Sequence, residues 1–223
     1  MIITIDGSSG TGKTTVAKQL AKSLKITFFD TGAMYRALAY FVLQQQIDPK
    51  NENELSKILS SFSFRIDSSE NDKRYFVNDE EVTSLIRTPQ ATEASSIISA
   101  HKTVREHLLS FQREYGAQQD VVFEGRDLGT VVFPDADYKV YLYASAEIRA
   151  QRRLKELKEK NPLSSKEFTY DEILNAINER DHRDTTRAIA PLRCPEKALE
   201  IDTSHLSSEE VVDKIIAHIR GQK

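Results

Sequence analysis

A glycine-rich segment close to the start of the chain has the residue types and spacing of a phosphate-binding loop. It follows the pattern Gly-x-x-x-x-Gly-Lys-Thr, with Gly7, Gly12, Lys13 and Thr14 at the fixed positions. Glycines adopt backbone angles that other residues avoid, so a ligand can approach the main chain closely. In such a loop the backbone N–H groups face a phosphate chain, the lysine contacts the outer phosphates and the threonine hydroxyl binds Mg²⁺. The alternative is a glycine turn that binds no ligand.

The residues on either side of this segment favour phosphate binding. Residues 1–5 are apolar and largely β-branched, which predicts a buried strand, and the apolar residues between 16 and 24 fall on one face of a helix. Strand, loop and helix thus come in the order that the motif requires. The residues predicted to bind nucleotide phosphates are Gly7, Ser8, Ser9, Gly10, Thr11, Gly12, Lys13, Thr14 and Thr15.

Two further segments place polar side chains directly after short apolar runs. Residues 26–29 predict a strand, and residues 30–36 open a helix whose start is either a second anion site or an ordinary capped helix. Residues 121–123 predict another strand, which leads into the charged segment 124–127. Charges at the end of a buried strand are costly unless something neutralises them. This segment is therefore either part of a ligand site or an internal arginine–aspartate pair.

A later helix carries a stripe of charged residues. Thr169 and Glu172 have the spacing of a capping box, which predicts a helix start. Arg180, Asp184 and Arg187 then follow at i, i+4 and i+7 and project from one side of that helix. The stripe is compatible with ion pairs within the helix, and also with a clamp on ribose and phosphates, because arginine forks match phosphate oxygens. In a chain with a phosphate loop we favour the clamp. The basic run before it, 149–158, is typical of a solvated helix face.

The overall pattern predicts an α/β fold. Short apolar strands alternate with helices, which is typical of a parallel sheet with helices on both faces, and ligands of such sheets bind beyond the carboxyl ends of the strands. The five strands are expected near 1–5, 26–29, 121–123, 138–143 and 198–201.

A different pattern between 62 and 97 indicates an insert. The alternating residues of 62–66 and 75–77 predict a β-hairpin, to which 82–86 adds a third short strand. The insert is therefore expected to be a small α+β subdomain. Neighbouring helices are expected over 54–62, 88–99 and 103–115, with Gly116 stopping the last.

Composition indicates a soluble globular chain. Its 223 residues suit one α/β domain with a small insert, and 39% hydrophobic and 29% charged residues are ordinary values. The sequence has no signal peptide and no run of about twenty apolar residues, and its single Cys194 fits a reducing cytoplasm. A net charge of −3 argues against a large nucleic-acid surface. We therefore expect a cytoplasmic protein that binds neither membrane nor nucleic acid.

Four segments taken together resemble the bacterial cytidylate kinase family of nucleoside monophosphate (NMP) kinases, and the likeness covers nearly the whole chain. The first segment is generic to phosphate-loop proteins, whereas the other three are much more specific. They are Gly-Ser-Ser-Gly-Thr-Gly-Lys-Thr at 7–14, Asp-Thr-Gly-Ala-Met-Tyr-Arg at 30–36, Gly-Arg-Asp-Leu-Gly-Thr-Val-Val-Phe-Pro at 125–134 and Glu-Arg-Asp-His-Arg-Asp-Thr-Thr-Arg-Ala at 179–188.

The resemblance implies a single P-loop kinase domain with three parts. The core comprises 1–30, 103–148 and 190–223, the NMP-binding region with its insert spans 31–102, and a helical lid spans 149–189. The implied reaction is the ATP-dependent phosphorylation of CMP and dCMP to CDP and dCDP. Mg²⁺ accompanies ATP in this reaction, and the implied enzyme is a monomer.

The resemblance also implies roles for individual residues. Thr14 is the implied Mg²⁺ ligand, and Glu124 acts near the metal through water. Family members often have Asp at the position of Glu124 and Ser at the position of Thr31, and both replacements keep the functional group. The implied catalytic residues are Lys13, Arg126, Arg183 and Arg187. The residues implied to bind CMP are Thr31, Tyr35, Arg36, Ser96, Arg105, Arg126, Asp127, Arg180, Asp184 and Arg187.

Two alternatives stay open. One is another small-molecule kinase, with UMP, AMP or shikimate as acceptor. The family positions that read the cytosine ring are matched by Ser96, Arg105 and Asp127, which favours a base with an amino donor and a carbonyl acceptor. The other alternative is a nucleotide-binding switch, but the chain lacks the Asn-Lys-x-Asp and Asp-x-x-Gly motifs of such proteins.

Overall fold

The computed structural model describes residues 1–68, 73–160 and 169–221. The chain divides into two compact units, which we call unit 1 (1–29 and 116–223) and unit 2 (30–115). The predicted division into core, NMP-binding region and lid stays a prediction.

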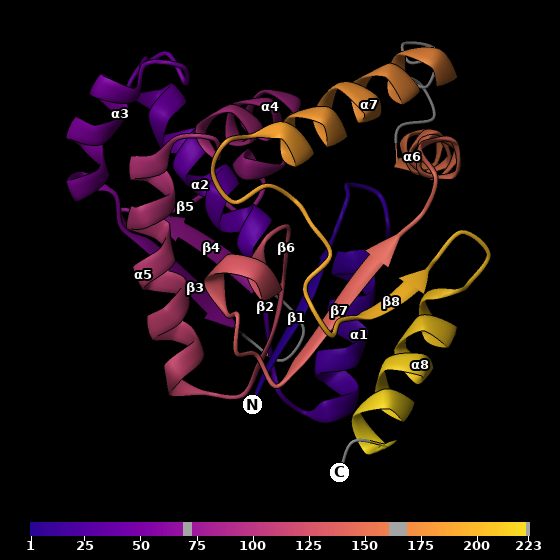
Figure 1. The fold of residues 1–223 in the computed structure, drawn as a ribbon. Helices are drawn as coiled ribbons and strands as arrows, with labels where there is room; N and C mark the ends of the chain where they lie inside the picture. The colour runs from indigo at the N-terminus through magenta and orange to yellow at the C-terminus, as the bar shows by residue number, and fades with distance from the viewer. Residues whose placement is uncertain (69–72, 161–168, 222–223) are drawn as a thin grey trace. The chain divides into compact units, whose positions relative to one another are not determined.

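Unit 1 is built on a five-stranded sheet with the strand order β2-β6-β1-β7-β8 (Figure 1). Strand β1 runs parallel to β6 and β7, and β7 runs parallel to β8, so the predicted parallel sheet is confirmed. Because β1 lies at the centre, the loop that follows it leaves the middle of the carboxyl edge of the sheet. The strands are β1 (Ile2–Gly7), β2 (Thr27–Asp30), β6 (Val121–Gly125), β7 (Tyr138–Tyr143) and β8 (Leu199–Asp202).

The two faces of β1 have different surroundings. Ile3 and Ile5 lie in a buried apolar cluster with side chains of α1 (Lys13–Leu24) and α8 (Ser208–Gly221). Thr4 and Asp6 alternate with them along the strand and are also fully buried. Burial of each large apolar side chain in such a cluster stabilises the fold by about 2 kcal/mol, so β1 is held firmly in place.

The helix α5 (Lys102–Gln118) runs past its predicted end. Gly116 does not stop the helix, so that prediction was wrong. A Cβ at Gly116 would lie 3.1 Å from Cε1 of Phe133 and 3.2 Å from Cε2 of Phe123. The rings of Phe123 and Phe133 pack with centroids 4.5 Å apart. The glycine therefore makes room for two aromatic rings.

Two helices lie between β7 and β8 in the chain and pack against each other. α6 (Ala146–Lys160) begins after Ser145, whose Oγ accepts a hydrogen bond from the Ile148 N–H at 3.4 Å. α7 (Tyr170–Thr186) begins with the predicted capping box of Thr169 and Glu172. The pair Asn161-Pro162 in the sequence predicts the end of α6, but both residues lie outside the described part of the chain. No helix in the described part of the chain has the length and apolar character that crossing a bilayer requires.

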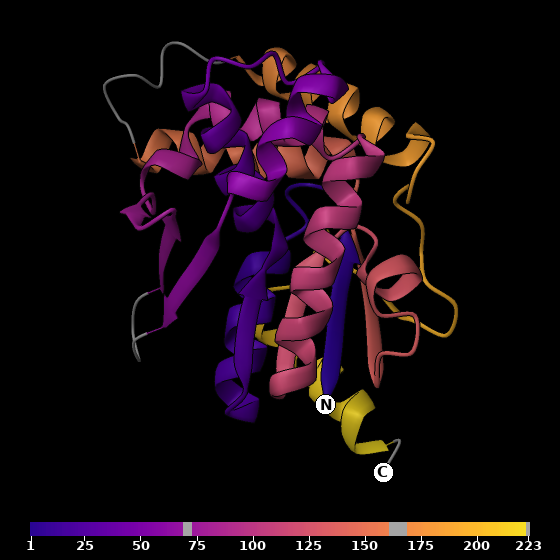
Figure 2. The same cartoon turned by 90° about the vertical axis from the view of Figure 1, so that its left-hand side faces the viewer.

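Unit 2 combines helices with a small antiparallel sheet. The predicted hairpin is confirmed, because β3 and β4 pair in antiparallel fashion (Figure 2). The predicted helix 54–62 is a shorter helix, α3, followed by a single 3₁₀ turn. The elements of this unit are α2 (Thr31–Gln44), α3 (Glu52–Ile58), β3 (Phe64–Ser68), β4 (Lys73–Val77), β5 (Glu80–Glu81) and α4 (Pro89–Ile98).

The prediction of a third strand at 82–86 was wrong. The strand β5 is shorter and comes earlier, and Leu85–Arg87 form a 3₁₀ turn. Val82 and Ile86 are both buried, and the Ile86 N–H donates to the Val82 carbonyl at 3.0 Å. Ser84 between them is exposed, so the burial fits a helical turn and not the alternation with a period of two that the prediction assumed.

Candidate active site

The loop after β1 has the backbone conformation of a phosphate-binding loop. Gly10 and Gly12 have φ of 82° and 90°, in the region that favours glycine, and Gly12 is the N-cap of α1. Gly7 has φ of 149°, and a Cβ there would lie 2.0 Å from the carbonyl oxygen of Leu142 in β7. Among the described residues no side chain caps α1, so the N–H groups of its first turn are available to an anion.

Lys13 is buried at the start of α1 within a group of charged side chains. Its Nζ donates to the carbonyl oxygen of Ser8 at 2.6 Å, and the Thr11 hydroxyl donates to the same oxygen at 3.0 Å. Burial and the nearby Arg126 guanidinium lower the pKa of Lys13, while the Glu124 carboxylate opposes this shift. Two neighbouring cations that are shielded from water favour the binding of an anion beside them.

Thr14 and Glu124 are in direct contact. The Thr14 hydroxyl donates to Oε1 of Glu124 at 2.5 Å, and Glu124 is buried in β6, in register with Ile5 of β1. Hydroxyl and carboxylate oxygens are the donors that Mg²⁺ prefers. Within the described residues there is no group of three or more His, Cys, Asp or Glu side chains that suits a metal. A Mg²⁺ ion here would therefore take its other ligands from phosphate and water.

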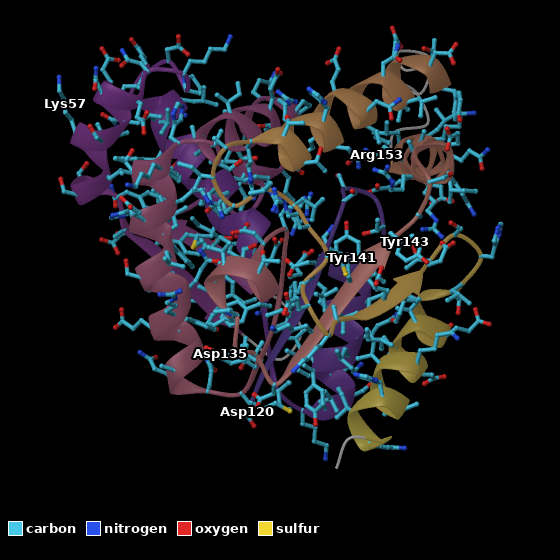
Figure 3. All side chains as sticks on the ribbon, viewed as in Figure 1. Lys57, Asp120, Asp135, Tyr141, Tyr143 and Arg153 are labelled. Atoms are coloured by element: carbon cyan, nitrogen blue, oxygen red, sulfur yellow. The ribbon has the colours of Figure 1, made fainter. Side chains whose placement is uncertain are left out.

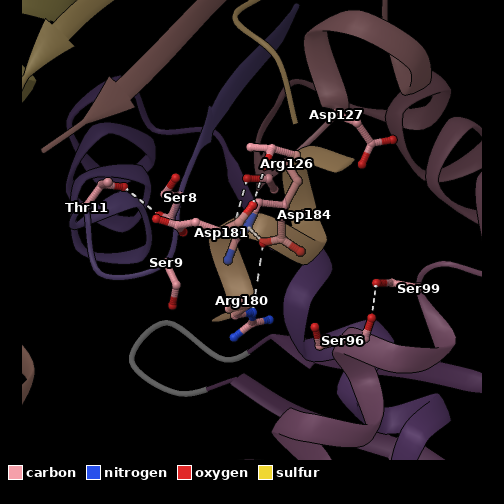
Figure 4. A network of polar contacts seen from close by, with 12 residues as sticks. Ser8, Ser9, Thr11, Ser96, Ser99, Arg126, Asp127, Arg180, Asp181 and Asp184 are labelled. Carbon is pink, nitrogen blue, oxygen red and sulfur yellow. Dashed lines mark hydrogen bonds and ion pairs between the residues drawn. The ribbon is translucent and has the colours of Figure 1, made fainter. Parts of the chain in front are cut away.

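Arg126 and Asp184 form an ion pair that joins the segment after β6 to α7 (Figure 4). Nε of Arg126 donates to Oδ2 of Asp184 at 2.9 Å, and the two side chains are 19% and 6% exposed. Arg180, one turn earlier on α7, has Nε 3.9 Å from the same oxygen. Burial favours the neutral acid, but Arg126 and Arg180 outweigh it and lower the pKa of Asp184. The predicted stripe on α7 is thus linked to the segment after β6.

The neighbouring Asp127 pairs with the next arginine of the stripe. Nη2 of Arg187 donates to Oδ1 of Asp127 at 3.0 Å, and its Nε donates to the Ala190 carbonyl at 2.7 Å. The alternative of a local pair between Arg126 and Asp127 is therefore not what the structure contains. Arg183 is exposed on the same helix.

In unit 2, Asp30 holds both the start of α2 and Arg36. One of its oxygens accepts from the Ala33 N–H at 2.8 Å, and the other accepts from Nη2 of Arg36 at 3.1 Å. A Cβ at Gly32 would lie 2.9 Å from Nη1 of Arg36, so this glycine leaves room for the guanidinium. Thr31 is buried at the first position of the helix. The start of α2 is a capped helix, and its role in anion binding stays a prediction.

Unit 2 contains two of the three residues predicted to read a base, Ser96 and Arg105, whereas Asp127 belongs to unit 1. The Cζ of Arg105 lies 5.9 Å from the Tyr35 ring centroid, and Nη1 of Arg105 donates to the Ser99 carbonyl at 3.1 Å. The Ser99 hydroxyl in turn donates to the Ser96 carbonyl at 2.9 Å (Figure 4). Oγ of Ser96 is buried and has no hydrogen-bond partner within the described residues. Buried hydroxyls are seldom unsatisfied, so this one fits a ligand contact.

The sequence interpretation missed the role of Arg149. The run 149–158 was expected to be solvated, and Arg153 is exposed, but Arg149 is 4% exposed. Its Nη1 donates to the Ser9 carbonyl in the phosphate loop at 3.1 Å, and its Nη2 donates to Oδ2 of Asp181 at 2.6 Å. Arg149 therefore connects α6 and α7 to the loop. Its place just beyond the carboxyl end of β7 was the signal that identifies it.

The fold and the loop define the class of protein. A parallel sheet with a phosphate loop after its central strand is the fold of P-loop nucleotide-binding proteins. The chain resembles the crystal structure of shikimate kinase from Bacteroides thetaiotaomicron with a TM-score of 0.50 and 13% sequence identity. That match covers 99% of this chain and 98% of the other chain, and at such low identity it bears on the fold alone.

Sequence comparison then gives the family. The family model for cytidylate kinase matches residues 3–221. The chain is 48% identical to a cytidylate kinase of Protochlamydia amoebophila over 98% of this chain and 96% of that protein. It is 44% identical to a cytidylate kinase of Carboxydothermus hydrogenoformans over 100% of this chain and 98% of that protein. The chain therefore belongs to the cytidylate kinase family.

Proposed function

We propose that this chain transfers the γ-phosphoryl group of ATP to CMP and to dCMP, with ADP and the nucleoside diphosphate as products. The observation that carries the proposal is the buried group of charges beside the phosphate loop. There, burial and, after it, the proximity of Arg126 lower the pKa of Lys13 and so disfavour its charged form. A phosphate chain would neutralise both cations and remove this penalty. Membership of the cytidylate kinase family supports a cytidine nucleotide as acceptor.

The chemistry requires no general base. The nucleophile is an oxygen of the acceptor phosphate, whose second pKa is about 6, so it is largely deprotonated at neutral pH. The enzyme then has to align the two nucleotides and neutralise charge on the transferring phosphoryl group. A site rich in arginine fits this requirement, and none of the five histidines has to serve as a base.

The proposed roles are those that the resemblance to the cytidylate kinase family implies. The loop 7–15 binds the ATP phosphates, and Lys13 stabilises the transferring group together with Arg183. The acceptor phosphate is proposed to bind three arginines, Arg36, Arg126 and Arg187. The cytosine ring is proposed to contact Ser96, Arg105 and Asp127, and the ribose and phosphate to contact Thr31, Tyr35, Arg180 and Asp184.

Mg²⁺ is proposed to accompany ATP, and the residues present fit it. Thr14 and Glu124 place two oxygen donors within 2.5 Å of each other beside the loop. When bound, the ion neutralises phosphate charge and orients the phosphate chain. The hydrogen bond from the Thr14 hydroxyl to the Glu124 carboxylate holds both donors in position. Glu124 is proposed to contact the ion through a water.

Turnover with a panel of acceptors tests the proposed function. ATP is supplied with CMP, dCMP, UMP or AMP, and ADP release is measured for each. We expect CMP and dCMP to be used best, because a base with a carbonyl at position 4 presents the wrong partner to Asp127. Faster use of UMP or AMP than of CMP would contradict the proposal. Tight GTP binding without acceleration of ADP release by CMP would indicate a switch protein instead.

We also propose that the enzyme acts as a monomer in the cytoplasm, without nucleic acid or membrane as partner. The net charge of −3 argues against a nucleic-acid partner, the single cysteine fits a reducing cytoplasm, and the family resemblance supports the monomer. Light scattering on the purified protein at micromolar concentration tests the oligomeric state. A dimer mass at the lowest concentrations would contradict the monomer.

A further inference from the structure

Asp6 is a buried carboxylate that none of the roles above uses. It lies at the end of β1, one residue before the phosphate loop, and its side chain is fully buried. Oδ1 accepts a hydrogen bond from the Leu128 N–H at 2.9 Å, and Oδ2 accepts one from the Gly129 N–H at 2.8 Å. Each oxygen thus binds one of two consecutive backbone N–H groups on a different segment of unit 1.

These two N–H groups belong to the first residues of a π-helical turn, Leu128–Val132. The turn is closed by bonds from the Val132 N–H to the Asp127 carbonyl at 3.2 Å and from the Phe133 N–H to the Leu128 carbonyl at 2.7 Å. The first N–H groups of a helical turn have no partner within it and need an acceptor from elsewhere. Asp6 supplies that acceptor from the neighbouring strand.

The same turn is packed closely on its other sides. A Cβ at Gly129 would lie 2.8 Å from Cγ of Pro195 and 3.0 Å from Oγ1 of Thr4. The turn therefore cannot shift toward either residue without a clash. Its position is determined by the two hydrogen bonds to Asp6 and by this packing.

We propose that Asp6 is a positioning residue that holds the segment carrying Arg126 and Asp127 in register with the phosphate loop. The two residues come directly before the turn, and both are assigned to the acceptor nucleotide, so this inference rests on the proposed function. Asp6 and the first loop glycine, Gly7, are adjacent in the chain. A single rigid carboxylate thereby links the donor loop to the acceptor-binding segment.

The electrostatic environment shows that this carboxylate is retained at a cost. Burial raises the pKa of Asp6 to about 7, although the Gly129 and Leu128 N–H groups oppose the shift. Asp127 raises it further and Lys13 lowers it. Burial raises the pKa of Tyr141 in β7 (Figure 3) and of Cys194, and the charge of Asp6 adds a smaller increase to each. Residues that destabilise a fold are typically kept where they are needed for function, and the ionised Asp6 is such a residue.

Asp6→Asn is the direct test, because asparagine keeps the shape but has only one acceptor oxygen. We expect KM for CMP to rise by about tenfold, since one buried N–H loses its partner, while KM for ATP changes by less than about twofold. Amide hydrogen exchange should show faster exchange at Leu128 or Gly129 in the variant. Equal changes in both KM values, or an unchanged KM for CMP, would overturn the proposal.

Thr4→Val is the matched control. Thr4 is buried on the same face of β1 and lies against the same turn, but its Oγ1 has no hydrogen-bond partner within the described residues. Its replacement should leave both KM values and the exchange of Leu128 and Gly129 unchanged. If Thr4→Val raised KM for CMP as much as Asp6→Asn does, the proposal would be overturned. Any substitution on this face of β1 would then raise KM for CMP, whether or not it removed a hydrogen bond to the turn.

A second variant keeps the test decisive if Asp6→Asn does not fold. Gly129→Ala displaces the same turn from its other side, and it should raise KM for CMP in the same direction. An unchanged KM would overturn the proposal. If the wild-type protein does not use CMP, the proposed function fails and the inference fails with it. Slow, Asp6-dependent exchange at Leu128 and Gly129 would then show that the hydrogen bonds are real and that the function was wrong.

Discussion

Arg187 donates from Nη2 to Oδ1 of Asp127 at 3.0 Å, and the side chains are only 6% and 9% exposed. The resemblance assigns the arginine to the acceptor phosphate and the aspartate to the base. The structure shows that the two groups bind each other in the protein alone. A change at either residue therefore acts on the ion pair as well as on the ligand, and the two proposed contacts are expected to be coupled.

The substitution Asp127→Asn tests this coupling. Asparagine keeps the size of the side chain but removes its charge and offers the base a donor as well as an acceptor. We expect the preference for CMP over UMP, measured as the ratio of kcat/KM values, to fall by about tenfold or more. Asp135→Asn is the control, because Asp135 is exposed on the following segment (Figure 3). A retained CMP preference in Asp127→Asn would exclude base reading by this residue.

The pair of Arg126 and Asp184 gives a prediction about stability. Asp184→Asn leaves the guanidinium of Arg126 largely buried without its charged partner. Removing one member of a buried pair typically costs about 3 kcal/mol, and we expect a loss of that order in the free energy of unfolding measured with denaturant. Arg126→Gln in the same background should restore part of the loss.

The substitution Asp184→Ala should also affect the turnover of CMP and of dCMP unequally, because Asp184 is proposed to contact the ribose. Equal effects on the two acceptors would remove this proposed contact.

Much of the fold was predictable from local patterns. The five strands and the capping box at Thr169 followed from runs of apolar residues and from polar residues at fixed spacing. Such signals depend on a few neighbouring residues. The end of α5 was not predictable in this way, because Gly116 is placed by its contact with Phe133, which lies outside the helix.

In the candidate site, too, features set by local patterns were predictable, whereas contacts between distant residues were not. Glu124 and Arg126 do lie beside Lys13 of the phosphate loop, since β1 and β6 end at the same edge of the sheet. Which aspartate pairs with which arginine was not predictable, because Arg126 and Asp127 are adjacent in sequence but pair with different residues of the α7 segment. Arg149 and Asp6 were missed for a similar reason. Their partners, the Ser9 carbonyl and two N–H groups of a turn, are backbone atoms that no residue type reveals.

Lys13→Ala is expected to reduce turnover more than binding. The lysine charge matters most when negative charge develops on the transferring phosphoryl group, so kcat should fall by about 100-fold or more. Lys22→Ala is the matched control, because Lys22 is exposed in the last turn of the same helix. Steady-state kinetics with saturating ATP and CMP measure the effect. An unchanged kcat in Lys13→Ala would remove the catalytic role.

The loop glycines should respond differently to an added methyl group. Gly7 and Gly12 both have positive φ, so alanine is strained at either position by about 1 kcal/mol or more. At Gly7 the new Cβ would also lie 2.0 Å from the Leu142 carbonyl oxygen, whereas at Gly12 nothing lies within 4 Å. Gly7→Ala should therefore lower the melting temperature much more than Gly12→Ala. Equal shifts in the two variants would mean that β7 does not pack on the loop as described.

The raised pKa of Asp6 predicts how stability depends on pH. Because burial raises this pKa to about 7, the folded protein keeps the proton at pH values where the unfolded chain has released it. The stability contributed by this proton is complete below the unfolded pKa of about 4 and is lost as pH rises through about 7. Between pH 5 and 7 the wild-type protein should lose about 2 kcal/mol of unfolding free energy relative to Asp6→Asn. Denaturant titrations of both proteins at several pH values measure the difference. Parallel pH profiles for the two proteins would show that Asp6 stays ionised over this range, held by its two backbone hydrogen bonds.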